Sequence, residues 1–166
     1  KLSIIAKAVL SAPRIYIFAK GESYLAGSIF RNNLLKLDRH VTMADDGGLQ
    51  TLHVKNGRPG DLFLFLSYSG IHYDYSKYAT ALSERGIKPC LITAFSDSAL
   101  ARQCDTVLLI PKSERVIGKV ANYSSMISLT YTLQVIYSLI FNQDYQENYR
   151  VKREADSFIF TSFAEI

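Results

Sequence analysis

Residues 62–70 read Leu-Phe-Leu-Phe-Leu-Ser-Tyr-Ser-Gly, an apolar run that ends in two serines, a tyrosine and a glycine. Five consecutive apolar residues predict a strand buried on both faces, and the segment that follows has helical spacing. A strand that passes into a helix through such a turn presents serine hydroxyls and free backbone N–H groups at one point. This arrangement favours the binding of an anion, above all a phosphate. The alternative is that these residues only cap a helix.

Strand-like and helix-like runs alternate on both sides of this stretch. The strand-like runs are residues 14–19, 40–44, 61–66, 88–93 and 106–110. The helix-like runs between them are residues 22–37, 48–55, 73–85 and 98–104. The alternation is typical of βαβ units. It predicts an α/β fold, a three-layer α/β/α sandwich with a five-stranded parallel sheet.

Helices are also expected at residues 2–11 and 121–141. The apolar stretch 126–141 is too short and too polar for a membrane span, which needs about 20 apolar residues, so we expect no membrane contact. Its two apolar faces predict that one packs on the domain and the other on a partner subunit. Residues 143–166 form a C-terminal extension with several aromatic side chains, which we expect to pack on the domain or on a partner subunit.

The composition is that of one globular domain spanning residues 1–166, with 48% hydrophobic residues. The net charge of +4 comes from scattered basic residues, so we expect the chain itself to bind no DNA. Cys90 and Cys104 form no CxxC pair and the histidines do not cluster. We therefore expect no metal site, no cofactor, and reduced thiols in a cytoplasmic protein. The start at Lys1, inside an amphipathic run, predicts a fragment of a longer protein.

Polar residues directly follow three of the predicted strands. They occupy residues 19–23, 67–70 and 93–98. In an open parallel sheet, ligands bind outside the carboxyl ends of the strands. We therefore expect these three segments to meet in one binding site.

Two of these segments resemble the hallmarks of the sugar isomerase (SIS) domain family. The family has a G-x-G-x-S turn after its first strand, here Ala-Lys-Gly-Glu-Ser at residues 19–23, and an S-x-S-G turn after a central strand, here residues 67–70. The resemblance covers residues 14–111 and implies a flavodoxin-like strand order. The chain is most similar to the C-terminal, phosphosugar-binding domain of RpiR-type transcriptional regulators. In those proteins a helix-turn-helix domain precedes the SIS domain.

The resemblance implies that eight residues bind the ligand. Ser67 and Ser69 correspond to hydroxyls that cradle the phosphate, and Gly70 lets the backbone come close to it. Thr93 ends the strand that lines the far side of the site. The full set is Gly21, Ser23, Ser67, Tyr68, Ser69, Gly70, His72 and Thr93.

The chain departs from the family pattern at several of these turns. Ala19 replaces the first glycine of G-x-G-x-S, and Met126 replaces the arginine of a late Ser-Ser-Arg segment. His72 stands where the family usually has threonine, and Asp74 where it often has glutamate. An imidazole at this position would bind an anion better when protonated. The alternative for His72 is a surface residue in the first turn of a helix.

The function predicted from these features is that of a phosphosugar sensor in a transcriptional regulator of carbohydrate metabolism. Ligand binding in a homodimer or homotetramer would alter DNA binding by an attached helix-turn-helix domain, which is absent from this chain. The prediction rests on a phosphate cradle without an obvious catalytic set, so we expect no catalytic residues.

Two alternatives remain open at this point. An aldose–ketose phosphate isomerase needs a positioned base, for which Glu22, His72 and Glu114 are the candidates. Glu114 falls in a charged run that we expect to form a surface loop. The third possibility is a structural dimer module with a relic pocket.

Overall fold

The computed structural model describes residues 1–44 and 46–164, with residues 159 and 161–164 described in their backbone alone. Five strands form one sheet in the order β2-β1-β3-β4-β5, and every neighbouring pair is parallel. The strands are β1 (Ile15–Ala19), β2 (Val41–Ala44), β3 (Leu62–Leu66), β4 (Cys90–Thr93) and β5 (Thr106–Leu109). This architecture confirms the predicted α/β fold and its flavodoxin-like strand order.

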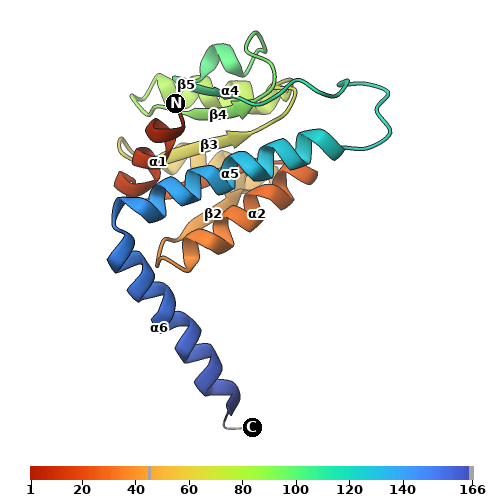
Figure 1. The fold of residues 1–166 in the computed structure, drawn as a ribbon. Helices are drawn as coiled ribbons and strands as arrows, with labels where there is room; N and C mark the ends of the chain where they lie inside the picture. Colours follow the sequence, from red (N-terminus) through yellow and green to blue (C-terminus); the bar gives the residue numbers. More distant parts are fainter. Residues whose placement is uncertain (45, 165–166) are drawn as a thin grey trace.

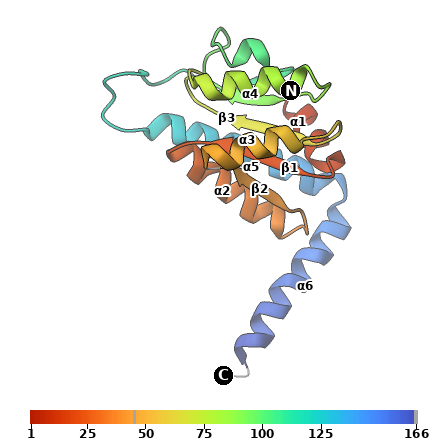
Figure 2. The same ribbon diagram turned by 180° about the vertical axis from the view of Figure 1, so that it is seen from behind.

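Helices cover both faces of the sheet. One face carries α1 (Leu2–Ser11), α2 (Glu22–Leu35) and α5 (Tyr123–Gln143), as Figure 1 shows. The opposite face carries α3 (Gly47–Asn56) and α4 (Tyr73–Ser83), which lie in front in Figure 2.

Side chains on the buried strands alternate between two apolar cores. In β1, Ile15 and Ile17 belong to the core beneath α1, α2 and α5, whereas Tyr16 and Phe18 belong to the core beneath α3 and α4. Strand β3 lies between β1 and β4 and is buried along its whole length, as its unbroken apolar run predicts. The turn that follows β3 is therefore anchored on both sides.

The helix predicted at residues 98–104 is wrong. The structure has one short 3-10 turn there, η1 (Ala101–Gln103). The Ser98 hydroxyl accepts a hydrogen bond from the Ala101 amide, and the Leu100 amide donates to the Gly70 carbonyl. These bonds use backbone groups that a longer helix would need, and they tie the segment to the turn after β3.

Helix α5 is long and apolar enough by composition alone to cross a membrane, and within the described residues it is the one helix that meets this test. One of its faces packs in the same core cluster as residues of α1 and α2, through Leu129, Leu133, Ile136 and Ile140. One face of α5 thus packs on the domain, as the sequence predicts. The opposite side exposes Tyr123, Ile127 and Tyr131.

Helix α6 (Tyr145–Ala164) accounts for most of the predicted C-terminal extension. It leads away from the sheet and its covering helices in both views (Figures 1 and 2). Among the described residues, its most extensive contacts are with the neighbouring α5. The structure thus does not show the extension lying on the domain, and its packing on a partner subunit stays a prediction.

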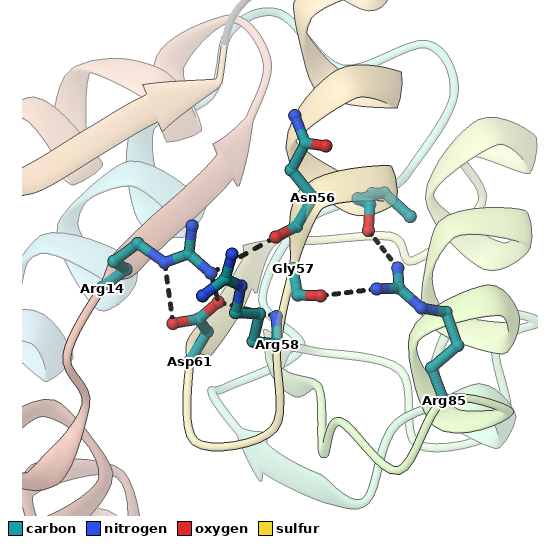
Figure 3. A network of polar contacts seen from close by, with 7 residues as sticks. Arg14, Asn56, Gly57, Arg58, Asp61 and Arg85 are labelled. Carbon is teal, nitrogen blue, oxygen red and sulfur yellow. Dashed lines mark hydrogen bonds and ion pairs between the residues drawn. The ribbon is translucent and has the colours of Figure 1, made fainter.

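A polar network holds the start of β3 at the edge of the sheet remote from the turn (Figure 3). The Asp61 carboxylate, whose side chain is 1% exposed, accepts hydrogen bonds from the Arg14 guanidinium at 2.6 and 3.0 Å and from the Arg58 amide at 2.8 Å. Arg85 donates to the carbonyls of Val54 and Gly57 at the end of α3. These bonds close the loop between α3 and β3, which sets where β3 begins.

Candidate functional site

The amino-terminal ends of three helices converge on one cavity at the carboxyl edge of the sheet. The cavity has a volume of about 210 Å³ and is bordered by the first turns of α2 and α5 and by the residues that lead into α4. Its walls are formed by Lys20, Glu22, Ser23, Ser67, Tyr68, Ser69, Ile71, His72, Val116, Lys119, Asn122, Ser125 and Met126. Six of the eight predicted ligand-binding residues either line this cavity directly or sit in the turn that forms its floor.

The turn after β3 forms that floor. The Ser67 hydroxyl accepts a hydrogen bond from the Gly70 amide at 3.1 Å, which closes the turn, and Gly70 has a φ of 64°. A side chain at Gly70 would meet Ser98, whose Cβ would lie 2.6 Å from the added Cβ. Glycine is thus required here both for its backbone conformation and for the close approach of Ser98. Ser67 and Ser69 both line the cavity, as predicted.

Thr93 does not reach the cavity. Its side chain is fully buried, and its hydroxyl donates to the Tyr68 carbonyl at 3.0 Å and accepts from the Phe95 amide at 3.3 Å. The predicted ligand contact at Thr93 is therefore not what the structure shows. Thr93 instead stabilises the turn after β3, because its hydroxyl is hydrogen-bonded to the backbone of that turn.

The turn after β1 supplies a second wall. Gly21 is the N-cap of α2 with a φ of 57°, and Ser23 in the first helical turn lines the cavity. Neither α2 nor α4 has a side-chain cap at its amino-terminal end, whereas Asp46 caps α3 with two hydrogen bonds. At α4 this leaves backbone N–H groups and the positive end of the helix dipole available to an anion, whereas at α2 the Glu22 carboxylate bonds its own backbone amide.

The third wall comes from the loop between β5 and α5. The Tyr68 hydroxyl donates to the Glu114 carbonyl at 2.9 Å and accepts from the Glu114 amide at 2.7 Å. The Glu114 carboxylate accepts from the Ser125 amide at 3.0 Å and from the Ser125 hydroxyl at 2.7 Å. The expectation of a solvated surface loop is thus wrong at Glu114, whose side chain is 9% exposed. The loop is held beside the cavity because Tyr68, in the turn after β3, binds its backbone and Ser125, in α5, binds the Glu114 side chain.

Charged side chains line the cavity and lie beside it. Lys20 lies 3.9 Å from Asp74, and Lys119 lies 3.7 Å from Glu114. The Glu22 carboxylate is hydrogen-bonded to the Asn122 side chain and to the backbone amide of Glu22 itself, and both bonds hold the pKa of Glu22 below its usual range. Partial burial and the nearby Lys20 charge lower the pKa of His72, although Asp74 opposes this. The imidazole of His72 is therefore neutral at pH 7 when no anion is bound.

Burial alone would raise the pKa of Glu114. Hydrogen bonds from the amides of Ser125 and Ser124 and from the Ser125 hydroxyl outweigh this effect, and Lys119 adds to them. The pKa of Glu114 lies below its usual value as a result, so the carboxylate is ionised at neutral pH.

Sequence reasoning missed the residues that the β5–α5 loop and α5 bring to the cavity. They are Val116, Lys119, Asn122, Ser125 and Met126, together with Ile71 next to the floor. The Ser-Ser pair at residues 124–125 was the one available signal. It could not be placed on the cavity wall because the length and path of the preceding loop follow no local pattern.

Among the described residues, no group of three or more His, Cys, Asp or Glu side chains could hold a metal ion. Cys90 and Cys104 are both free. Burial raises the pKa of the Cys90 thiol to about 11 and that of the Cys104 thiol to about 12. Neither thiol is a ready nucleophile at neutral pH.

Comparison with known proteins gives consistent results. The sequence model of the family described as "SIS domain" matches residues 9–140. The glutamine–fructose-6-phosphate aminotransferase (isomerizing) of Bacillus licheniformis is 30% identical over 143 residues, which cover 82% of this chain and 23% of that enzyme. The chain thus spans less than a quarter of this relative's length.

Two solved structures share the fold. The sugar isomerase domain of an RpiR transcription factor from Sphaerobacter thermophilus superimposes with a TM-score of 0.80 at 22% identity, over 94% of this chain and 85% of that one. The Vibrio vulnificus NanR protein, complexed with ManNAc-6P, gives a TM-score of 0.86 at 20% identity, over 96% of this chain and 60% of NanR.

Proposed function

The chain belongs to the SIS domain family, and on this premise we propose that it binds a phosphosugar as the sensor domain of a transcriptional regulator of carbohydrate metabolism. The observation that supports the proposal is the convergence of Ser67 and Ser69 with the first turn of α2 and the uncapped end of α4 on one cavity. Hydroxyls, backbone N–H groups and helix dipoles together favour a phosphate. The likeness to RpiR and NanR supports the regulatory role.

The charged groups favour binding over catalysis. An isomerase base works best with a pKa near the operating pH, yet the Glu22 and Glu114 carboxylates both have lowered pKa values. The Glu114 carboxylate is also occupied by hydrogen bonds from Ser125. His72 supports the alternative, an aldose–ketose phosphate isomerase, because its imidazole lines the cavity and is neutral.

The proposed sensor acts as a homodimer or homotetramer. The outer side of α5 exposes Tyr123, Ile127 and Tyr131 at four-residue spacing, and the neighbouring α2 exposes Leu25 and Ile29. An apolar surface of this kind is typical of a subunit interface. Ligand binding would shift the arrangement of subunits only as far as it favours one arrangement over another, and an attached helix-turn-helix domain would pass this change on to DNA.

A panel of sugar phosphates that includes N-acetylmannosamine 6-phosphate tests the proposal. At a concentration 100 times the Kd, a ligand should stabilise the domain by about 2.7 kcal/mol, or roughly 5–10 °C in melting temperature. Product formation is followed in the same samples. Stabilisation without conversion supports the sensor, conversion supports the isomerase, and no stabilisation by any member supports a relic pocket.

Ser69→Ala assigns the response to this site. Its hydroxyl lines the cavity, so we expect the variant to lose the ligand stabilisation while the empty domain keeps its melting temperature. Ser76→Ala on α4 is the matched control, because the Ser76 hydroxyl faces the His72 carbonyl and does not line the cavity. Equal ligand stabilisation in Ser69→Ala and Ser76→Ala would show that the ligand binds elsewhere.

A further inference from the structure

The amino-terminal end of α5 differs from that of α4, because a carboxylate of this chain already occupies it. Glu114 accepts hydrogen bonds from the Ser125 amide at 3.0 Å and the Ser125 hydroxyl at 2.7 Å, and it also interacts with the Ser124 amide. The side chain is 9% exposed, so it is held in place and poorly screened by water. The negative charge of Glu114 therefore offsets the positive end of the α5 dipole.

The α4 side of the cavity has the opposite character. The turn of residues 67–70 and the N-cap His72 lead into α4, whose amino-terminal end has no side-chain cap. Lys20 lies beside it, with its Nζ 5.2 Å from the centre of the Tyr75 ring. Lys20 is paired with the Asp74 carboxylate at 3.9 Å, and the Asp74 side chain is 62% exposed and thus well screened. A phosphate is favoured on this side.

A second carboxylate adds to the negative charge near α5. Glu22 is ionised and bonded to Asn122, the N-cap of α5. Lys119 offsets part of this charge, with its Nζ 3.7 Å from Glu114. Two carboxylates therefore face one ammonium group and one helix end that is already capped. These groups suit sugar hydroxyls, which can donate to Glu22 and accept from Asn122 or Lys119.

We propose that Glu114 makes the cavity selective for sugars that carry a single anionic group, with the phosphate beside α4 and the neutral polyol beside α5. This inference rests on the proposed function and names its ligand class. Sugar bisphosphates and phosphorylated sugar acids place a second negative charge against the α5 wall, where Glu22 lines the cavity and the Glu114 carboxylate is bonded at 2.7 Å to the hydroxyl of the lining residue Ser125. Like charges that lie close together in a partly buried site repel each other, which disfavours such ligands.

Two matched pairs of compounds test the selectivity on the unmodified protein. Sorbitol 6-phosphate and 6-phosphogluconate differ only in a hydroxymethyl or a carboxylate group at one end. Fructose 6-phosphate and fructose 1,6-bisphosphate differ only in one phosphate. We expect the member of each pair with one anionic group to bind at least about tenfold more tightly in calorimetric titrations. Equal or tighter binding of the members with two anionic groups would overturn the inference.

Glu114→Gln identifies the residue responsible, because glutamine keeps an oxygen for the Ser125 amide but removes the charge. In this variant the preference within each pair should fall by about tenfold. Asp74→Asn is the matched control: it removes one negative charge on the α4 side and should leave the preference unchanged. An unchanged preference in Glu114→Gln would overturn the assignment to Glu114. If none of the four compounds nor N-acetylmannosamine 6-phosphate bound the unmodified protein, the proposed function would fail and this inference with it.

Discussion

Replacing Gly70 with alanine should destabilise the domain far more than the same change at another glycine of similar conformation. Gly70 has a φ of 64°, where a Cβ costs about 1–2 kcal/mol. The added Cβ would also overlap the Ser98 Oγ and lie 2.6 Å from the Ser98 Cβ. The Oγ can rotate away but the Cβ cannot, since it moves only with the backbone. Overpacking of this kind costs about 1–3 kcal/mol more.

The total of about 2–5 kcal/mol corresponds to a fall in melting temperature of roughly 5–15 °C for a chain of this length. Gly86→Ala is the control, because Gly86 has a φ of 73° and nothing lies within 4 Å of the position of its added Cβ. It should show the backbone cost alone. Thermal and denaturant unfolding of both variants measure the difference, which isolates the steric contribution of Ser98.

A second change gives an independent check. In the Gly70→Ala background, Ser98→Gly removes both atoms that the new Cβ meets, leaving Thr93 Oγ1 at 3.5 Å, an ordinary contact. Ser98→Gly by itself loses the bond to the Ala101 amide and should cost about 1 kcal/mol. The double variant should therefore be more stable than the two separate losses predict. If the losses simply add, or if Gly70→Ala behaves like Gly86→Ala, the reasoning is refuted.

Three further predictions concern other parts of the molecule. The pKa of His72 is lowered in the folded state, so the unfolded chain binds more protons below pH 6.5. The free energy of unfolding of the empty domain should therefore fall as the pH drops from 7 to 5.5. His72→Gln should flatten this dependence, and a pH profile identical to that of the unmodified protein would contradict the assignment. Asp61→Ala should lower the melting temperature by about 5–10 °C, since the Arg14 guanidinium and the Arg58 amide lose a buried partner. A fall of less than about 1 °C would contradict this role. Tyr131→Lys, on the exposed side of α5, should weaken self-association by about tenfold or more in sedimentation experiments, whereas an unchanged assembly would place the subunit interface elsewhere.

The arrangement of elements could be read from local patterns. Alternating strand-like and helix-like runs predicted five parallel strands with helices on both faces, and the turns at residues 19–23 and 67–70 marked where α2 and α4 begin. The buried run at residues 62–66 and the Ser-Tyr-Ser-Gly turn after it located the floor of the cavity, because a strand in the middle of a parallel sheet must be apolar on both faces. The turn at residues 98–104 was misjudged, since its backbone bonds to Gly70 instead of continuing a helix.

Burial and partners decided what each site residue does, and these come from contacts between distant parts of the chain. Thr93 is of a residue type that commonly binds ligands and follows a strand, but its hydroxyl donates a hydrogen bond to the carbonyl of Tyr68, 25 positions away. Glu114 stands in a run of charges typical of a solvated loop, yet the Tyr68 hydroxyl, 46 positions earlier, holds its backbone over the cavity.

What the sequence alone determined is the scaffold and the phosphate-binding turn, because strand burial, helix periodicity and glycine-bearing turns depend on neighbouring residues. What only the tertiary structure decided is the third wall of the cavity and its charge, because the loop before α5 meets the turn after β3 through long-range hydrogen bonds. The position of Glu114 at the end of α5 results from that meeting. No residue within one helical turn of Glu114 in the sequence forms these bonds.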